Sequence, residues 1–176
     1  KQSELPSVVW DGLGLSNVHS GIGYYGAQLY EALNRLGVFP EVTASFDSAP
    51  QYVKSGNVIN IPRSCLGARL SSLKPIFPMR SYSAAKKSHQ MMLYHGLSNI
   101  NLPCFGRVRP KDKFIVTIHD IIPLIVKNNS PLAIQMKILL PNVLTRADQI
   151  ITGSKWAKET LLGAFGDKFG DKITAV

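Results

Sequence analysis

The chain has 176 residues, a formal net charge of +9 at pH 7, and an ordinary share of apolar residues, 45%. This composition excludes collagen-like, low-complexity and disordered chains. No run of about 18 apolar residues, the length that spans a bilayer, occurs. The most apolar stretch, residues 114–126, is interrupted by His119, Asp120 and Pro123. We therefore expect residues 1–176 to form one globular domain.

The cysteines and the start of the chain indicate an intracellular protein. Cys65 and Cys104 are too few for a disulfide framework, and they do not have the spacing of metal ligands. The chain does not begin with the charged and then apolar segments of a secretory signal. We expect two reduced thiols, no metal site and a cytoplasmic location.

Half of the positive charge lies in one stretch, residues 48–111, which contains no Asp or Glu. Its cations are Lys54, Arg63, Arg69, Lys74, Arg80, Lys86, Lys87, Arg107, Arg109 and Lys111. Such a one-sided segment favours anionic partners, for example an anionic membrane surface or a phosphate-bearing acceptor. Nucleic acid is not expected, because no known binding motif accompanies the charge. A solvated basic face without a partner is the alternative.

Apolar runs and amphipathic segments alternate in the first half of the chain. Residues 7–10 predict a strand, and residues 24–36 predict a helix with leucines spaced three and four apart. Residues 41–46 alternate as a second strand. Prolines interrupt residues 51–81, which we interpret as a long connection with short pieces of structure.

The pattern becomes regular from residue 80 onward. Apolar runs predict strands over residues 91–94, 114–118, 149–152 and 172–176. Periodicity and serine caps predict helices over residues 80–90, 130–146 and 154–165. Pro141 is expected to kink or split the second of these helices. Strands and helices that alternate at this interval indicate an α/β fold with an open parallel sheet covered by helices.

Polar residues follow the predicted strands, at the edge where parallel sheets bind ligands. They are Asp11, Gly12, His95, Gly96, His119, Asp120, Gly153, Ser154 and Lys155. Histidines at two of these strand ends can converge on one cleft. A structural role for each histidine is the alternative.

A glycine motif, Gly21–Gly26, precedes the first predicted helix and fits the pattern G-x-G-x-x-G. Its glycines would let backbone N–H groups approach a phosphate at a helix N-terminus. A dinucleotide site is disfavoured, because residues 12–20 separate the motif from its strand. Glu41, at the spacing of the acidic ribose ligand, begins the second strand instead of ending it. A phosphate or sugar loop, a flexible loop and a dinucleotide site all remain open.

Four segments, in this order and at these intervals, resemble the N-terminal domain of family 4 glycosyltransferases, a large retaining group with the GT-B fold. The segments are residues 21–33, 94–96, 117–123 and 147–154. The stretch T-I-H-D-x-I-P combined with A-D-x-I-I-T-x-S is the most specific part. The resemblance covers nearly the whole chain and is weakest over residues 51–80.

The resemblance implies a Rossmann-like open parallel sheet with helices on both faces, which is one half of a GT-B architecture. This half would bind the acceptor, and a C-terminal domain outside this chain would bind a nucleotide-sugar such as a GDP- or UDP-hexose. The implied reaction moves a mannose- or glucose-type sugar to a glycan or lipid-linked acceptor in cell-surface polysaccharide synthesis. No metal or other cofactor is implied. The protein would lie in the cytoplasm or peripherally on the inner face of the cytoplasmic membrane, and this chain alone would be inactive.

The resemblance also implies roles for single residues. His119 would face the donor sugar and act at the reacting centre. The expected substrate-binding residues are Gly21, Gly23, Tyr24, His95, Gly96, Asp120, Ser154 and Lys155. Two alternatives from other classes are a nicotinamide-dinucleotide-binding oxidoreductase domain and a non-catalytic module that binds anionic membranes.

Overall fold

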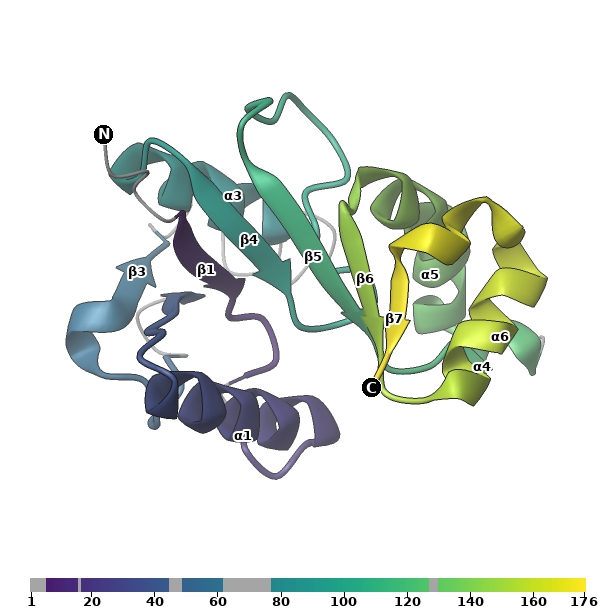
Figure 1. Ribbon diagram of the computed structural model, residues 1–176, viewed down its shortest axis with the longest axis horizontal. Helices are drawn as coiled ribbons and strands as arrows, with labels where there is room; N and C mark the ends of the chain where they lie inside the picture. Colours follow the sequence, from purple (N-terminus) through teal and green to yellow (C-terminus); the bar gives the residue numbers. More distant parts are fainter. Residues whose placement is uncertain (1–5, 16, 45–48, 62–76, 127–129) are drawn as a thin grey trace.

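The computed structural model describes residues 6–15, 17–44, 49–61, 77–126 and 130–176. These residues contain a seven-stranded sheet with the strand order β3-β2-β1-β4-β5-β6-β7, in which every pairing is parallel (Figure 1). The strands are β1 (Ser7–Asp11), β2 (Glu41–Ala44), β3 (Val58–Asn60), β4 (Met92–Gly96), β5 (Lys113–Ile118), β6 (Gln149–Thr152) and β7 (Ile173–Ala175). The predicted α/β fold with an open parallel sheet is confirmed.

Helices of very different lengths connect the strands. They are α1 (Gly21–Arg35), α3 (Phe77–Ser88), α4 (Ile122–Ile125), α5 (Pro131–Arg146) and α6 (Lys155–Phe165), with 3-10 turns η1 (Ser55–Asn57) and η2 (Asp167–Lys172). None of the helices in the described ranges has the length and apolar character that a membrane crossing needs.

Serine caps explain where the helices α5 and α6 begin. The Ser130 and Ser154 hydroxyls accept hydrogen bonds from the N–H groups of Ala133 and Ala157, at 3.2 and 3.1 Å. These caps satisfy N–H groups that would otherwise lack a partner in the first turn. The predicted helices over residues 130–146 and 154–165 are confirmed, and α5 runs unbroken through Pro141.

Several predicted boundaries are wrong. Gly21–Gly23 are not a loop, because the Ser20 hydroxyl accepts from the Gly23 N–H at 3.0 Å and starts α1 at Gly21. The connection over residues 51–81 contains short pieces of structure as predicted, η1 and β3, but α3 begins at Phe77 and not at residue 80. His95 and Gly96 are the last residues of β4 and do not follow it. Residues 45–46 of the predicted strand and residues 62–76 of the predicted connection lie outside the described residues.

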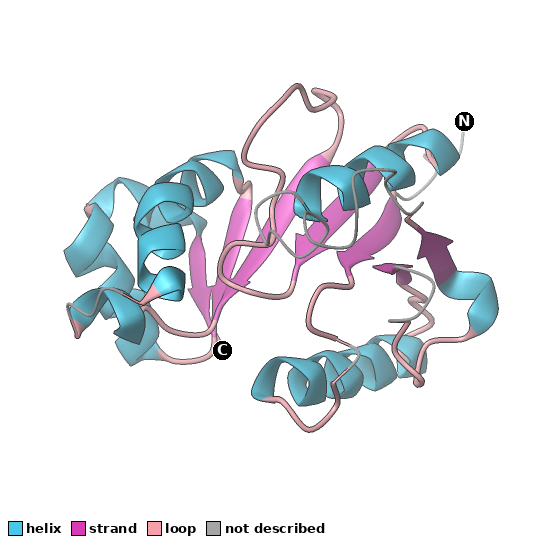
Figure 2. Ribbon diagram, turned by 180° about the vertical axis from the view of Figure 1, so that it is seen from behind, coloured by secondary structure: helices cyan, strands magenta, loops and turns pink. Residues whose placement is uncertain are grey.

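Helices cover both faces of the sheet. The adjacent β1 residues Val9 and Trp10 are both completely buried, but they belong to different apolar cores. Val9 packs in the larger core, which includes residues of α3, α5 and α6. Trp10 packs in the smaller core with Tyr30 of α1. From behind, α3 crosses in front of the strands, on the face away from α1 (Figure 2).

The chain reverses its direction across the sheet at β1. It proceeds from β1 to β2 and β3 on one side, and β4 then pairs with β1 on the other side. In such sheets the connections that leave the carboxyl ends of the two central strands diverge and leave a crevice. The arrowheads of β4–β7 in Figure 1 point toward the side where α1 lies, so the carboxyl edge of the sheet faces that side.

Candidate functional site

A cleft of about 590 Å³ lies at the carboxyl ends of β1, β4 and β5, which we call the carboxyl-edge cleft. The segments that line it are residues 13–14 after β1, 20–22 at the start of α1, 98–101 after β4, 119–120 and 123 after β5, and Leu132 of α5. Of the predicted site residues, Gly21, His119 and Asp120 line this cleft. The cleft therefore lies where the reversal of the chain predicts a binding site.

His119 is fixed in the cleft by hydrogen bonds to its backbone and its ring. Its backbone N–H donates to Asn99 Oδ1 at 2.9 Å, and its Nε2 lies 2.9 Å from the Leu97 carbonyl oxygen. A carbonyl oxygen only accepts hydrogen bonds, so we assign the ring proton to Nε2. In the neutral imidazole Nδ1 is then an acceptor. The Tyr25 ring packs edge-on against the imidazole, with ring centroids 5.2 Å apart.

Asp120 lies beside His119, and its carboxylate supports the local backbone. Asp120 Oδ1 accepts a hydrogen bond from the Ile122 N–H at 3.0 Å, at the first residue of the short helix α4. This helix was not predicted, because four residues are too few to show a helical period. One oxygen of the Asp120 carboxylate is therefore engaged in the turn that leads into α4.

The first turn of α1 forms the opposite wall of the cleft. A Cβ atom on Gly23 would lie 2.0 Å from the Asn17 carbonyl oxygen, so only glycine fits at this position. A Cβ atom on Gly21 would meet nothing within 4 Å. Gly23 thus allows close packing of the turn, whereas Gly21 lines the cleft. The helix dipole is positive at this end, and the first turn carries no acidic side chain.

His95 and Gly96 are buried in the sheet and do not line the cleft. His95 is 6% exposed, its Nε2 lies 2.9 Å from Thr117 Oγ1, and its ring packs edge-on against Trp10. Burial lowers the pKa of His95 to about 4, so the ring is neutral at neutral pH. A Cβ atom on Gly96 would lie 2.2 Å from the Asn101 carbonyl oxygen, so Gly96 permits a close approach of two backbone segments.

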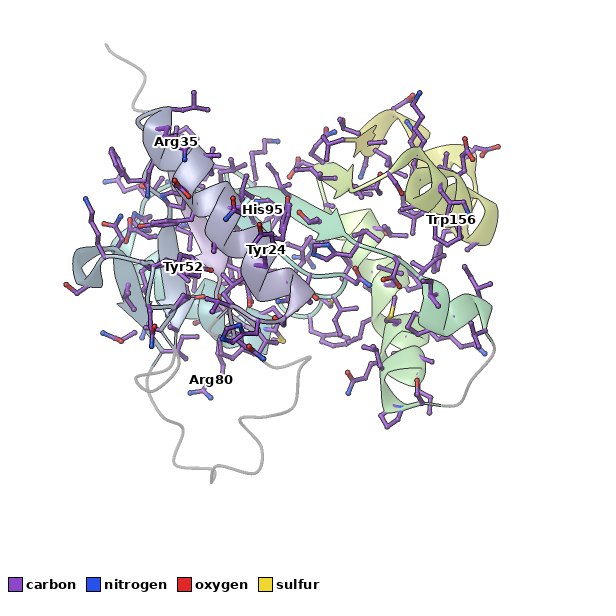
Figure 3. The ribbon with its side chains drawn as sticks, turned by 90° about the horizontal axis from the view of Figure 1, so that it is seen from below. Tyr24, Arg35, Tyr52, Arg80, His95 and Trp156 are labelled. Atoms are coloured by element: carbon purple, nitrogen blue, oxygen red, sulfur yellow. The ribbon has the colours of Figure 1, made fainter. Side chains whose placement is uncertain are left out.

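The three remaining predicted residues, Tyr24, Ser154 and Lys155, lie outside the carboxyl-edge cleft. Tyr24 on α1 is 62% exposed. Ser154 caps α6, and Lys155 lines a separate shallow hollow beside β7. In the view from below, Tyr24 lies on α1 well apart from Trp156, the neighbour of Lys155 on α6 (Figure 3).

Asp11 anchors a buried polar network beneath the cleft. Its carboxylate accepts from the Leu13 N–H at 2.8 Å and from the Tyr94 hydroxyl at 2.9 Å. The Asn101 amide donates to Asp11 at 3.2 Å and to the Leu13 carbonyl at 3.3 Å. The Tyr94 hydroxyl also lies 2.6 Å from Ser81 Oγ, which links the network to α3. Burial raises the pKa of Asp11 to about 7.

The sequence analysis missed the polar residues that follow β4. Ser98, Asn99 and Asn101 all line the cleft, and two of them hold neighbouring segments through their amides. The signal for them was in the sequence, because these three short polar residues lie two to five positions after Gly96, near a predicted strand end.

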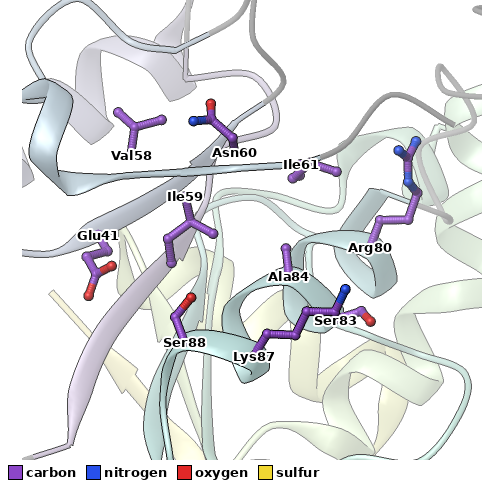
Figure 4. A pocket seen from close by; sticks show the side chains of 10 residues that line it. All are labelled: Glu41, Val58, Ile59, Asn60, Ile61, Arg80, Ser83, Ala84, Lys87 and Ser88. Atoms are coloured by element: carbon purple, nitrogen blue, oxygen red, sulfur yellow. The ribbon is translucent and has the colours of Figure 1, made fainter.

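A second hollow, of about 540 Å³, lies between β3 and α3 (Figure 4). Glu41 and Lys87 are among its lining residues. None of the predicted site residues lines it. Within the part of the chain that is described, no three His, Cys, Asp or Glu side chains are grouped so that they could hold a metal ion.

The basic stretch is partly used for structure. Arg109 forms a two-pronged ion pair with the buried Asp112, at 2.8 and 3.1 Å, and donates to the His89 carbonyl at 2.6 Å. The hydrogen bond with Asp112 raises the pKa of Arg109. By contrast, Lys86 and Lys87 on α3 are exposed. Only part of the charge in residues 48–111 is thus available to a partner.

Comparison with known proteins gives a family. The family model described as Glycosyltransferase Family 4 matches residues 19–176. The matched region begins just before α1 and contains His119, Asp120 and the residues after β4 that line the cleft. No curated protein matches the chain.

Proposed function

Because the chain belongs to Glycosyltransferase Family 4, we propose that this glycosyltransferase domain is the acceptor-binding half of a retaining enzyme. A C-terminal domain binds most of the donor, a nucleotide-sugar such as a GDP- or UDP-hexose. The enzyme transfers a mannose- or glucose-type sugar to a glycan or lipid-linked acceptor in cell-surface polysaccharide synthesis. The chemistry proceeds without a metal, and residues 1–176 alone do not turn over.

The position of His119 carries this proposal. His119 lies in the carboxyl-edge cleft opposite the first turn of α1, and Nδ1 is the ring nitrogen without a partner among the described residues. Nδ1 can accept a hydrogen bond from a sugar hydroxyl. The positive end of the α1 dipole stabilises charge that develops on a departing diphosphate. Together these groups stabilise a transition state in which the sugar becomes cationic and the leaving group anionic.

Substitution of His119 in the protein that contains both domains tests the proposal. We expect His119→Ala to lower kcat on the order of a hundredfold, the usual effect of removing one preorganised hydrogen-bonding group from a reacting centre. His89→Ala is the matched control, because His89 pairs with Glu41 at the amino ends of the strands, at 3.1 Å. A His119→Ala enzyme that turns over like the His89→Ala enzyme would refute the role of His119.

We also propose that the domain sits on the inner face of the cytoplasmic membrane through a basic face. We define the basic face as the exposed residues Lys86, Lys87, Phe105, Arg107 and Lys111. A Cβ atom on Gly106 would lie 3.5 Å from the Met79 side chain, so the loop that carries Phe105 and Arg107 adjoins α3. Cations beside an exposed aromatic ring suit an anionic bilayer surface.

A further inference from the structure

We propose that Asn99 is the positioning residue of this site, which holds His119 in place through both ends of its side-chain amide. The inference rests on the proposed function of His119 at the reacting centre. Asn99 Oδ1 accepts from the His119 N–H at 2.9 Å, and Asn99 Nδ2 donates to the Asp120 carbonyl oxygen at 2.7 Å. One amide thus binds the N–H and the C=O of the two-residue segment that joins β5 to the turn before α4.

This pair of bonds requires an amide at position 99. The His119 N–H can only donate and the Asp120 carbonyl can only accept, so the partner must present an acceptor and a donor side by side. Asparagine has this arrangement, whereas aspartate would face the Asp120 carbonyl with a second oxygen. The orientation of the Asn99 amide follows from the same argument, since a flipped amide would lose both bonds.

The same connection also holds the His119 ring. The Leu97 carbonyl accepts from Nε2 at 2.9 Å, and Leu97 itself is completely buried. Residues 97 and 99, in the connection after β4, therefore fix both the backbone and the tautomer of a histidine that follows β5. We infer that loss of the Asn99 amide frees the 119–120 segment, loosens the Leu97 contact and lets the imidazole sample both tautomers.

The ring nitrogens of His119 provide a direct readout on this chain. At pH about 8.5, where an ordinary imidazole is neutral, the wild type should give separate ¹⁵N signals for a protonated Nε2 and an unprotonated Nδ1. In Asn99→Ala and Asn99→Asp the two shifts should move toward each other. Asn57→Ala is the matched control, because Asn57 donates to the Tyr30 hydroxyl at 3.2 Å, outside the cleft. Unchanged ring signals in both Asn99 variants would overturn the inference, and Asn99→Asp, which keeps one hydrogen bond, serves if Asn99→Ala does not fold.

Turnover of the two-domain enzyme separates positioning from acceptor binding. We expect Asn99→Ala to lower kcat between roughly tenfold and a hundredfold, with the KM for acceptor nearly unchanged, because a misplaced reacting group slows the chemistry. In the background of His119→Ala, Asn99→Ala should have little further effect on kcat. Equal losses in both backgrounds would mean that Asn99 does not act through His119. A His119→Ala enzyme with normal turnover would instead refute the proposed function, while the ring signals would still test the placement of His119 by Asn99.

Discussion

Asp11 and His95 are both buried near the carboxyl edge of the sheet, and burial favours the neutral form of each. For Asp11 this raises the pKa from 3.8 to about 7, so the folded protein binds a proton that the unfolded chain releases. For His95 it lowers the pKa from 6.5 to about 4, so the unfolded chain binds a proton that the folded protein excludes. The two groups therefore act in opposite directions on stability as the pH changes.

Replacement of each residue should change the pH dependence of the unfolding free energy, in opposite directions for Asp11 and His95. Between pH about 4 and 6.5 the contribution of Asp11 falls as the pH rises and that of His95 grows, each on the order of 3 kcal/mol. The difference in unfolding free energy between Asp11→Asn and wild type should therefore rise with pH, and that between His95→Gln and wild type should fall. Urea unfolding across this range measures both. Two difference curves with the same sign of slope would contradict the prediction.

At the scale of single elements, the first turn of α1 requires a glycine at position 23 but not at position 21. A side chain at Gly23 would collide with the Asn17 carbonyl, whereas a side chain at Gly21 would enter open space. The N–H of Gly23 is also the group that Ser20 caps. Of the three glycines in the motif, Gly23 packs against backbone and Gly26 against the side chains of Leu15 and Tyr52, whereas Gly21 has free space around it.

Alanine substitutions of these two glycines should differ clearly in stability. We expect Gly23→Ala to reduce the free energy of unfolding by about 2 kcal/mol or more, because the turn must shift away from the Asn17 carbonyl. Gly21→Ala should be neutral or slightly stabilising, because alanine has the higher helix propensity. Thermal or urea unfolding compares the pair directly. Equal losses in the two variants would show that the steric contact with Asn17 is relieved at little cost.

The elements that the sequence predicted well are long or have a clear chemical start. The helix α5 was predicted because Ser130 and Pro131 form a capped first turn, and β5 because five apolar or β-branched residues run together. The strand β3 and the helix α4 were not predicted. The four residues of α4 are too few for a helical period to show, and β3 lies in the stretch that prolines interrupt. The sequence analysis ended the predicted strand before His95 and Gly96, although both residues belong to β4.

Sheet topology made part of the site predictable. His119 follows β5, so a parallel sheet brings it to the carboxyl edge whatever the details of packing. Asn99 and Leu97 hold His119 from a different connection, about 20 residues earlier in the chain. Such contacts between segments depend on tertiary packing, which no local spacing in a single sequence encodes.

At the scale of the whole molecule, the charge and the cleft occupy different regions. The carboxyl-edge cleft is lined by small, apolar and neutral polar residues together with His119 and Asp120, and no Lys or Arg is among its described lining residues. The basic face lies on α3 and on the connection between β4 and β5, which also carries the ion pair of the half-buried Arg109 with the buried Asp112. The basic face therefore shares none of the residues that line the cleft.

Reversal of charge on the basic face should weaken binding to anionic vesicles. In sedimentation with phosphatidylserine-containing vesicles at low salt, each Lys near the surface contributes about 1 kcal/mol, so Lys86→Glu with Lys87→Glu should reduce affinity at least about tenfold. Lys137→Glu with Lys168→Glu makes the same change in net charge on exposed residues of α5 and η2, and should have a much smaller effect. Added salt should weaken the wild type toward the level of the first pair, because screening acts on exposed charges. If both pairs lose affinity equally, or if neutral vesicles bind as well as anionic ones, the basic face is only a solvated surface and the location of the domain must depend on another part of the protein.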